Sequence, residues 1–554
     1  MQPPKFEDYD PFKPERKRRP LLKAFLAVTL LTAGAAGYGV YRLTRTTPLA
    51  PTLLPAETPA FVSFTPGMAA LGGLPVLKRA YPQAFSWQGY QDFRTRCERD
   101  LGLNFEKDVA PWLGIEMDVA FSQAEAAGAT LFFASHNDDR ARAALAKVRM
   151  ARQRKGEEAS PETYEGVAYD NYPGGQALGV VGGFVVWASS EAAFRGIVDR
   201  AQHRNAETLA ADPEYKALLG QLPGDAVARF FVSAGGAKGA MPTSKDARRA
   251  LEAYRGLAGA LVLQRDQVAL ETVAHLDPTQ LPEPFNSHLA DLRQSVDPHL
   301  MDALPADAIS AMSFRLPPGT PEVVKGLMAD TLRGYPSIQQ AQQQAGVDLN
   351  RDLAAWMEGE LAVAIVPGKI DRGTPIELAL VMKPKDLQAA ETGLGHLREA
   401  WTRKMSPTLP GGQVLPSLYA FREQSRGGIP WQVLHDSAQN RDLGGYAVSG
   451  DKLFLAYGPT TLEHGGKPGA PLTADPAFKA AIGSLPRPNG GVMFLDVAGS
   501  YALAMPYLGD KAGELEAALR PVTAIAAAGT PGISDDGFMR STLVARVEEP
   551  TPAK

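Results

Sequence analysis

The sequence has a single cysteine, Cys97, among its 554 residues. One cysteine excludes an intramolecular disulfide framework and a thiolate-rich metal site. Cys97 lies in a stretch that we expect to be helical, without the histidine or asparagine signature of a thiol enzyme. We therefore interpret it as a structural or free thiol. The cellular compartment stays open, because many exported bacterial proteins also lack disulfides.

Motifs that carry chemistry are missing as well. The sequence contains no G-x-S-x-G, H-E-x-x-H, C-x-x-C or P-loop motif. The eight histidines are scattered, and none pairs at ligand spacing on a helix. His435 and Asp436 are the most suggestive neighbours, but adjacent residues of a strand face opposite sides of a sheet. The sequence therefore predicts no catalytic, metal-binding or cofactor-binding residues, and no cofactor.

The chain also lacks an excess of positive charge. Its net charge is −4 and its pI about 6.1, so no basic surface for nucleic acid is expected. The hydrophobic fraction of 45% is ordinary for a globular protein. A chain of this length is too long for one hydrophobic core, and two or three domains are expected.

The N-terminus predicts a membrane tether. Residues 1–20 form a polar tail that ends in four basic residues, and the uncharged stretch Ala24 to Tyr41 lies within a transmembrane helix expected over residues 21–43. Eighteen helical residues span about 27 Å, enough for a bilayer core. The basic cluster before the segment places the N-terminus in the cytoplasm and the bulk of the chain outside it, periplasmic or external.

A cleaved export signal is the alternative for this segment. Arg18-Arg19 resembles the start of a twin-arginine signal, and Ala33-Gly34-Ala35 resembles a cleavage site. Both interpretations export the body of the chain. A proline-bearing linker, residues 44–53, follows the segment.

The body of the chain contains the same stretch twice. LGLNFEKDVAPWLGIEMDVAF, residues 101–121, aligns without a gap with AGVDLNRDLAAWMEGELAVAI, residues 345–365. Seven positions are identical, where composition alone gives roughly one or two. They are Gly102/Gly346, Asp108/Asp352, Ala110/Ala354, Trp112/Trp356, Glu116/Glu360, Val119/Val363 and Ala120/Ala364.

Two further blocks repeat in the same order. Residues 54–64 match 304–314, and residues 211–223 match 474–486. The repeat unit is therefore about a domain long. We expect two tandem homologous domains, residues 54–300 and 301–548, followed by a disordered tail, residues 549–554.

Hydrophobic periodicity predicts an α+β fold, each domain a largely antiparallel sheet with helices packed on it. The expected strands include residues 60–64, 309–314 and 452–457. Asp212 and Asp475 are expected to cap short helices that begin at a proline. Further helices are expected over residues 76–101, 138–155, 245–257, 321–345, 385–404 and 513–528, with closing hairpins at 258–276 and 533–547.

These features resemble a known family. The N-terminal anchor, the Leu-Pro-Ala opening strand, the Asp-Trp-Glu stretch and the Asp-Pro helix are similar to the uncharacterised bacterial, membrane-anchored proteins known as domain of unknown function 3352. The resemblance covers most of residues 54–547. The family implies an exported, membrane-anchored protein, and it has no established activity, ligand or catalytic residue to carry over.

The best constellation of polar residues is Asp108, Trp112 and Glu116, with its copy Asp352, Trp356 and Glu360. A spacing of four places the three side chains on one helical face, and two acids beside an aromatic ring are typical of a sugar or cation site. The structural interpretation is that aspartate caps a helix, tryptophan fills the core, and glutamate begins a strand or binds a local amide. Duplication favours this scaffold interpretation.

The sequence therefore predicts a membrane-anchored, extracytoplasmic protein of the cell envelope that is a non-catalytic binding or scaffolding module. The expected partners are the membrane, through the N-terminal helix, and an envelope protein or a glycan. The alternative is an envelope hydrolase of glycans or lipids whose catalytic residues converge only in the folded chain. The ligand and the oligomeric state stay open.

Overall fold

The computed structural model describes residues 49–548 with gaps at 66–74, 83–84, 123–127, 203–206, 241–250, 282, 284–285, 317–318, 323, 326–345, 369–374, 406–416, 468, 510–512 and 514–518. The chain divides into two compact units: unit 1, Met1–Met241, and unit 2, Pro242–Lys554. The predicted transmembrane segment lies outside the described residues. Of the helices that are described, none is both long and apolar enough to cross a membrane.

Unit 1 is built on an antiparallel sheet whose hydrogen-bonded neighbours follow the order β8–β1–β2–β3–β7–β6–β5–β4. The strands are β1 (Ala60–Phe64), β2 (Leu113–Phe121), β3 (Ala129–Ser135), β4 (Ser160–Tyr164), β5 (Val167–Asn171), β6 (Ala177–Val181), β7 (Phe184–Ala188) and β8 (Ala228–Ser233). Gly182 and Gly183 have φ of 60° and 80° and close the tight β6–β7 hairpin, a backbone that glycine adopts without strain.

The helices of unit 1 are α3 (Trp87–Leu101), α4 (Asp138–Arg154), α5 (Glu191–Gln202), α6 (Pro213–Leu219) and α7 (Ala234–Ala240), with a π-helical turn η2 (Phe105–Val109). Asp212 caps α6, as predicted, by accepting a 2.7 Å hydrogen bond from the backbone N–H of Tyr215. Asn137 caps α4 in the same way. The first helical prediction, 76–101, covers two helices, residues 75–80 and α3.

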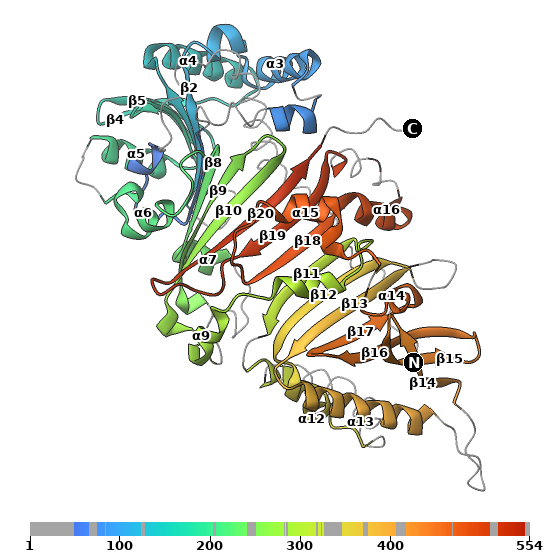
Figure 1. Ribbon diagram of the computed structural model, residues 1–554. Helices are drawn as coiled ribbons and strands as arrows, with labels where there is room; N and C mark the ends of the chain where they lie inside the picture. Colours follow the sequence, from blue (N-terminus) through green and yellow to red (C-terminus); the bar gives the residue numbers. More distant parts are fainter. Residues whose placement is uncertain are drawn as a thin grey trace, which may run out of the picture. The chain divides into compact units, whose positions relative to one another are not determined.

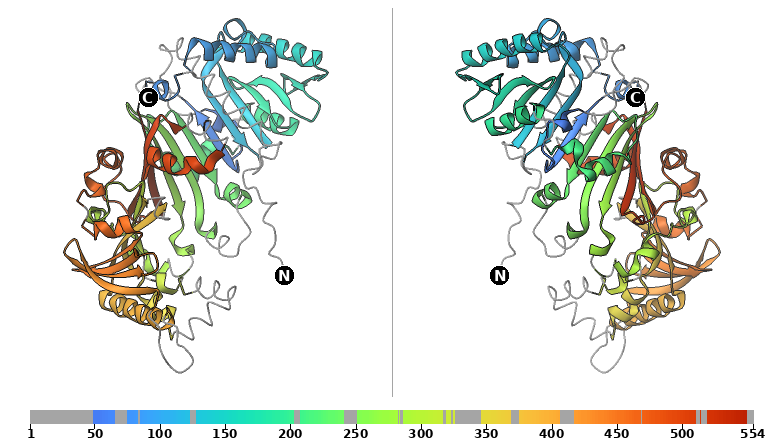
Figure 2. Two further views of the ribbon diagram at one scale, coloured as in Figure 1. Left: turned by 90° about the vertical axis from the view of Figure 1, so that its right-hand side faces the viewer. Right: turned by 90° about the vertical axis from the view of Figure 1, so that its left-hand side faces the viewer.

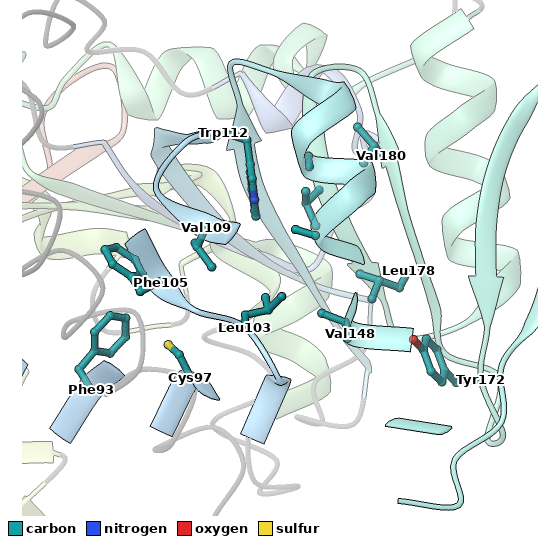
Figure 3. Close-up of a cluster of buried hydrophobic side chains, with 13 residues drawn as sticks. Phe93, Cys97, Leu103, Phe105, Val109, Trp112, Val148, Tyr172, Leu178 and Val180 are labelled. Atoms are coloured by element: carbon teal, nitrogen blue, oxygen red, sulfur yellow. The ribbon is translucent and has the colours of Figure 1, made fainter. Parts of the chain in front are cut away.

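A hydrophobic cluster holds α3, η2 and α4 against the sheet of unit 1 (Figure 3). Phe93 and Cys97 enter it from α3, Val148 from α4, and Leu178 from β6. Cys97 is a buried free thiol, and burial raises its pKa to about 11. Very little thiolate exists at neutral pH under these conditions, so Cys97 is a packing residue.

Unit 2 contains a longer antiparallel sheet with the order β9–β10–β20–β19–β18–β11–β12–β13–β17–β16–β15–β14. Both views of Figure 2 show the green β9–β10 hairpin beside the red strands β19 and β20. The strands are β9 (Tyr254–Leu263), β10 (Gln267–Leu276), β11 (Ser310–Leu316), β12 (Gly359–Pro367), β13 (Ile376–Pro384), β14 (Tyr419–Arg426), β15 (Ile429–Asp436), β16 (Arg441–Ser449), β17 (Lys452–Tyr457), β18 (Gly491–Asp496), β19 (Val522–Gly529) and β20 (Phe538–Val547).

The helices of unit 2 include α9 (Leu289–Leu292), α12 (Leu349–Asp352), α13 (Leu387–Met405), α14 (Pro459–His464), α15 (Pro476–Ile482) and α16 (Val497–Leu508). Of these, α13 and α15 pack on the sheet (Figure 1). Asp475 caps α15 as predicted. Phe478 of α15 packs on Phe494 of β18 with ring centroids 5.0 Å apart. α13 covers a second cluster that includes Trp356, Met382 and Leu453.

These elements confirm the predicted α+β class with an antiparallel sheet. Two helix predictions were partly wrong: residues 254–257 of the helix expected over 245–257 belong to strand β9, and the C-terminal part of residues 513–528 forms strand β19. The closing hairpin consequently pairs β19 with β20 and is not confined to residues 533–547. The alanine-rich sequence favours a helix locally, but the strand buries Ala524, Ala526 and Ala528 on one face of the sheet. Tertiary packing therefore decides the conformation.

The strands that carry the repeated blocks pair in the same pattern in each unit. Ser63 of β1 lies opposite Asp118 and Arg229, and Ser313 of β11 lies opposite Ala362 and Val492. The compact units divide at residues 241/242, whereas the repeat boundary predicted from the sequence lies at 300/301. The β9–β10 hairpin, expected in the first repeat, belongs to unit 2. The repeat boundaries stay a prediction.

Candidate functional site

The repeated tryptophans are core residues. Trp112 is 5% exposed and lies in the cluster of Figure 3, and Trp356 is 4% exposed. Each indole donates to the backbone carbonyl four residues earlier: Trp112 Nε1 to Asp108 O at 2.6 Å, and Trp356 Nε1 to Asp352 O at 2.9 Å. Both rings are buried, and their hydrogen bonds fix the turns that precede strands β2 and β12.

The repeated aspartates close that same turn. Asp108 Oδ2 accepts from the N–H of Asn104, and Asp352 Oδ2 accepts from the N–H of Asp348, both at 2.9 Å. Each aspartate also pairs with a base: Lys147 is 2.5 Å from Asp108, and Arg351 is 2.6 Å from Asp352. Both lie in the first turn of their short helices, and the N-cap residues are Asn104 and Asp348.

Charge and hydrogen bonds hold Asp352 ionised. Burial by itself raises its pKa, but hydrogen bonds from Arg351, from the Asp348 N–H and from His396 outweigh burial, and the pKa falls to about 2. His396 Nδ1 lies 3.1 Å from the carboxylate. A carboxylate so strongly held in its ionised form is a structural anchor and a poor general acid or base near neutral pH.

Each of the repeated glutamates binds backbone amides of the segment just before its predicted repeat domain. Glu116 lies in β2, is 5% exposed, and Oε1 accepts from the N–H groups of Leu49 (2.5 Å) and Ala50 (3.0 Å). Glu360 lies in β12, accepts from the N–H of Asp297 at 3.2 Å and pairs with Arg315. The glutamates are in strands, so the three residues do not share one helical face. The glutamates bind backbone amides, as predicted, but these amides lie 63–67 residues away in the chain and are not local.

A buried polar row crosses the sheet of unit 1 beside Glu116. Asp118 is 3% exposed and lies opposite Ser63, which in turn lies opposite Arg229. Three buried oxygens of this row have no partner with ordinary hydrogen-bond geometry among the described residues. They are the two carboxylate oxygens of Asp118 and the hydroxyl oxygen of Ser63. Arg229 donates to the carbonyls of Pro223 (3.0 Å) and Gly224 (2.9 Å) after α6.

Burial dominates the chemistry of Asp118. It raises the pKa of this carboxyl well above its ordinary value, and the neighbouring carboxylate of Glu116 raises it further. Asp118 is therefore a neutral acid at pH values where exposed aspartates are ionised. The sequence did not single out Asp118, because an aspartate two residues after Glu116 in a mostly apolar strand was the only signal.

His435 and Asp436 do not pair with each other, as expected for adjacent residues of a strand. His435 Nδ1 lies 2.8 Å from Asp442, and Arg426 lies 2.7 Å from the same carboxylate. Asp436 instead accepts hydrogen bonds from the N–H groups of Ala438 and Gln439 in the following turn. His435 thus takes part in a polar contact between β15 and β16. Within the described ranges, no group of side chains could hold a metal ion.

The most unusual surface of unit 2 is a strip of apolar side chains on one face of its sheet. Residues opposite each other in register lie on the same face, which defines a central row of Leu270, Leu543, Ala527, Met493, Met312 and Val363. A parallel row, two residues along each strand, consists of Val268, Ala545, Ile525, Leu495, Ser310, Ile365, Leu378 and Tyr457. We call these two rows the apolar strip.

Large members of the apolar strip are open to solvent. The exposed fraction is 42% for Met312, 39% for Met493, 37% for Leu543, 41% for Leu378 and 54% for Tyr457. None of the residues in the two rows is charged. A monomeric domain rarely exposes contiguous apolar surface of this kind unless it binds something there.

The opposite face of the same strands is buried and built from small side chains. Ala269, Val544, Ala526, Phe494, Ala311 and Ala364 form the matching row, and each is at most 2% exposed. α15 packs on this covered face through the contact of Phe478 with Phe494. This covered face stabilises the fold, whereas the apolar strip lies on the other face, where α13 packs at Leu380 and Leu455.

The sequence contained a signal for the apolar strip that its strand predictions did not use. In residues 361–365, both alternating positions are apolar: Ala362 and Ala364 face the core, while Leu361, Val363 and Ile365 face the other side. A half-buried strand with one solvated face would alternate apolar with polar residues. Which side is left open depends on where the helices pack, and that is a tertiary property.

The comparisons with known proteins agree with the resemblance found in the sequence. The profile of a family described as "Protein of unknown function (DUF3352)" matches residues 23–546. This chain belongs to that family. No curated protein matches the DUF3352 chain.

The solved structures similar to this DUF3352 protein include crystal forms I and III of TP0453. Form I is 11% identical, covers 42% of this chain and 79% of its own, and has a TM-score of 0.23. Form III is 11% identical, covers 43% and 84%, and has a TM-score of 0.25. Likeness at this level carries no argument about the site or the function.

Proposed function

We propose that this DUF3352 protein is a membrane-tethered, extracytoplasmic binding module of the cell envelope, without catalytic activity, and that the apolar strip of unit 2 is its binding surface. The observation that carries the proposal is the row of exposed Leu543, Met493 and Met312 on one sheet face. Met493 and Met312 are direct neighbours, and Ala527 lies between Met493 and Leu543. The uncharged segment Ala24 to Tyr41 supports the tether, and the repeated blocks support a tandem duplication of one α+β domain.

Energetics favour an occupied strip. Apolar surface removed from water contributes about 25 cal/mol per Å², so several neighbouring half-exposed side chains provide a strong driving force for association. The backbone N–H and C=O groups of these strands form hydrogen bonds within the sheet. They therefore do not compete with a ligand by binding water. Met312 and Met493 lie side by side at the centre, and methionine adapts its shape to irregular partners.

The alternative, an envelope hydrolase, rests on the acid pair of Glu116 and Asp118. Two neighbouring carboxyl groups, one of them with a raised pKa, are an arrangement that general acid–base catalysis uses. The two carboxyl groups are 5% and 3% exposed, however, and Glu116 is committed to two backbone amides. Burial and these hydrogen bonds favour a structural role, and we therefore prefer the binding function.

Photo-crosslinking in cells tests the proposed function without assuming what the partner is. p-Benzoylphenylalanine is placed at Met312 or Met493 in the full-length chain, and at Met150 of α4 as the matched control, whose side chain is 48% exposed. After irradiation we expect adducts of any kind, seen by gel shift or intact mass, at 312 and 493 and not at 150. Equal adduct yields at all three positions would reject the apolar strip as the binding surface.

A further inference from the structure

The apolar strip offers a partner almost nothing except hydrocarbon. Of its two rows, only Ser310 and Tyr457 carry a hydroxyl, and no residue carries a charge or an amide side chain. Interfaces between proteins carry about one hydrogen bond per 100–200 Å² and a polar rim. The chemical complement of this strip is therefore a molecule with neither charge nor hydrogen-bonding groups along the part that binds.

The strip also has the wrong proportions for a standard protein interface. It crosses eight neighbouring strands, from β10 to β17. At a strand spacing of about 4.8 Å, the strip is roughly 35 Å long, and it is only two residues wide. Protein interfaces of ordinary size cover compact patches of about 800 Å² on each partner. A long, narrow, flexible apolar ligand matches the strip better.

The two ends of the strip differ. α13 packs over Leu380 and Leu455, which continue the central row on β13 and β17. At the other end, the row reaches Leu270 and the hairpin β9–β10, where Leu261 is half-buried. The central row is thus closed at one end by a helix and continues to the half-buried Leu261 at the other. A chain-like ligand matches this linear arrangement.

We infer that the apolar strip binds the acyl chains of membrane phospholipids. This inference rests on the proposed function and names the occupant of the same surface. Rows of leucine, methionine, isoleucine and valine at half exposure provide the dispersion contacts and the water exclusion that a hydrocarbon chain requires. The polar head group needs no contact with the strip itself.

The inference is tested in cells that express the full-length chain. The cells are grown with a fatty acid that carries a diazirine within its chain and a terminal alkyne, and they incorporate it into their phospholipids. After irradiation, the chain is purified under denaturing conditions and the labelled peptides are mapped. The peptide that contains residues 24–41 is counted separately, because a membrane-spanning segment contacts acyl chains in every variant.

Acyl label is expected on the peptides that contain Met312 and Met493. The pair Met312→Glu and Met493→Glu should reduce this label at least tenfold, because a charge does not pair with hydrocarbon. The pair Met312→Gln and Met493→Gln, which keeps side-chain length, should reduce it less, and Met150→Glu should leave it unchanged. Both methionines are exposed, so these variants should fold, and circular dichroism of the purified chains checks that they do.

Three results would overturn the inference. Acyl label on the strip that survives the glutamate pair would show that contact does not depend on the apolar strip. A protein adduct at the benzoylphenylalanine positions, without acyl label on the same peptides, would show that the strip is a protein-binding surface and would leave the proposed function intact. Absence of any adduct at 312 and 493 would reject both the acyl-chain inference and the proposed binding function.

Discussion

Replacing Trp112 with alanine is expected to lower the free energy of unfolding of unit 1 by about 3–5 kcal/mol. The side chain is 5% exposed, it packs among Phe105, Val109 and their neighbours, and its indole N–H holds the Asp108 carbonyl. The substitution removes this packing and leaves a cavity together with an unsatisfied carbonyl. A loss of this size is a large share of the stability of a domain.

Hydrogen exchange of the detergent-solubilised full chain measures the effect in each unit separately. Trp87→Ala is the matched control, because Trp87 lies on α3 of the same unit and is 71% exposed; its effect should stay within about 0.5 kcal/mol. Trp356→Ala should destabilise unit 2 as Trp112→Ala destabilises unit 1. Equal effects of Trp112→Ala and Trp87→Ala would contradict the scaffold role of the repeated stretch.

Unit 1 is expected to lose stability as pH rises, through Asp118. Burial, and next the carboxylate of Glu116, raise the pKa of Asp118 in the folded chain above its ordinary value of 3.8. Between that value and the raised pKa, the folded state holds a proton that the unfolded state has released. The contribution of Asp118 to stability is therefore greatest below about pH 3.8 and declines as pH rises toward the folded pKa.

The substitution Asp118→Ala should remove this pH dependence and raise the free energy of unfolding of unit 1 at pH 8 by about 1–3 kcal/mol, the cost of burying a polar group without a partner. Alanine is the residue at the corresponding position of β12, Ala362, which is fully buried. The groups that face Asp118 are Glu116, Ser63, Tyr215 and Arg229. They remain unchanged in the variant.

Asp352 supplies a control with the opposite sign. Its pKa is lowered to about 2, so its stabilising contribution is present above the unfolded value of 3.8 and declines as pH falls toward 2. Hydrogen exchange in β2 and in α12 across pH reports the two residues independently. If the stability of β2 falls as pH rises to the same extent in Asp118→Ala as in the unsubstituted chain, another group is responsible for the pH dependence.

Much of the fold follows from local sequence. Asp212-Pro213 and Asp475-Pro476 predict capped helices because the side-chain oxygen and the fixed proline φ act within one turn. The strand at residues 60–64 and the strand at 452–457 were predicted with the bounds that the structure has. Strand β19 was missed because its alanines have a high intrinsic helix propensity, and only pairing with β18 and β20 makes them extended.

The sites follow less directly from the sequence. The structural roles of Trp112 and Glu116 were predicted from their duplication, but Asp118 beside them was not, because its burial depends on β1 and β8 pairing across it. The apolar strip combines residues from 268 to 545. No local pattern reveals that Met312 and Met493 are neighbours, since their register is set by strands far apart in the chain.

Cysteine protection in native membranes tests the central claim, that the apolar strip is occupied, most directly. The only natural cysteine, Cys97, is buried with a pKa of about 11 and gives little background. Met312→Cys and Met150→Cys place thiols at sites of nearly equal exposure, 42% and 48% in the free chain. The account predicts that a maleimide labels Cys at 312 at least tenfold more slowly than at 150 in isolated membranes, and equally fast after denaturation. Equal rates at both positions in the membranes would contradict it.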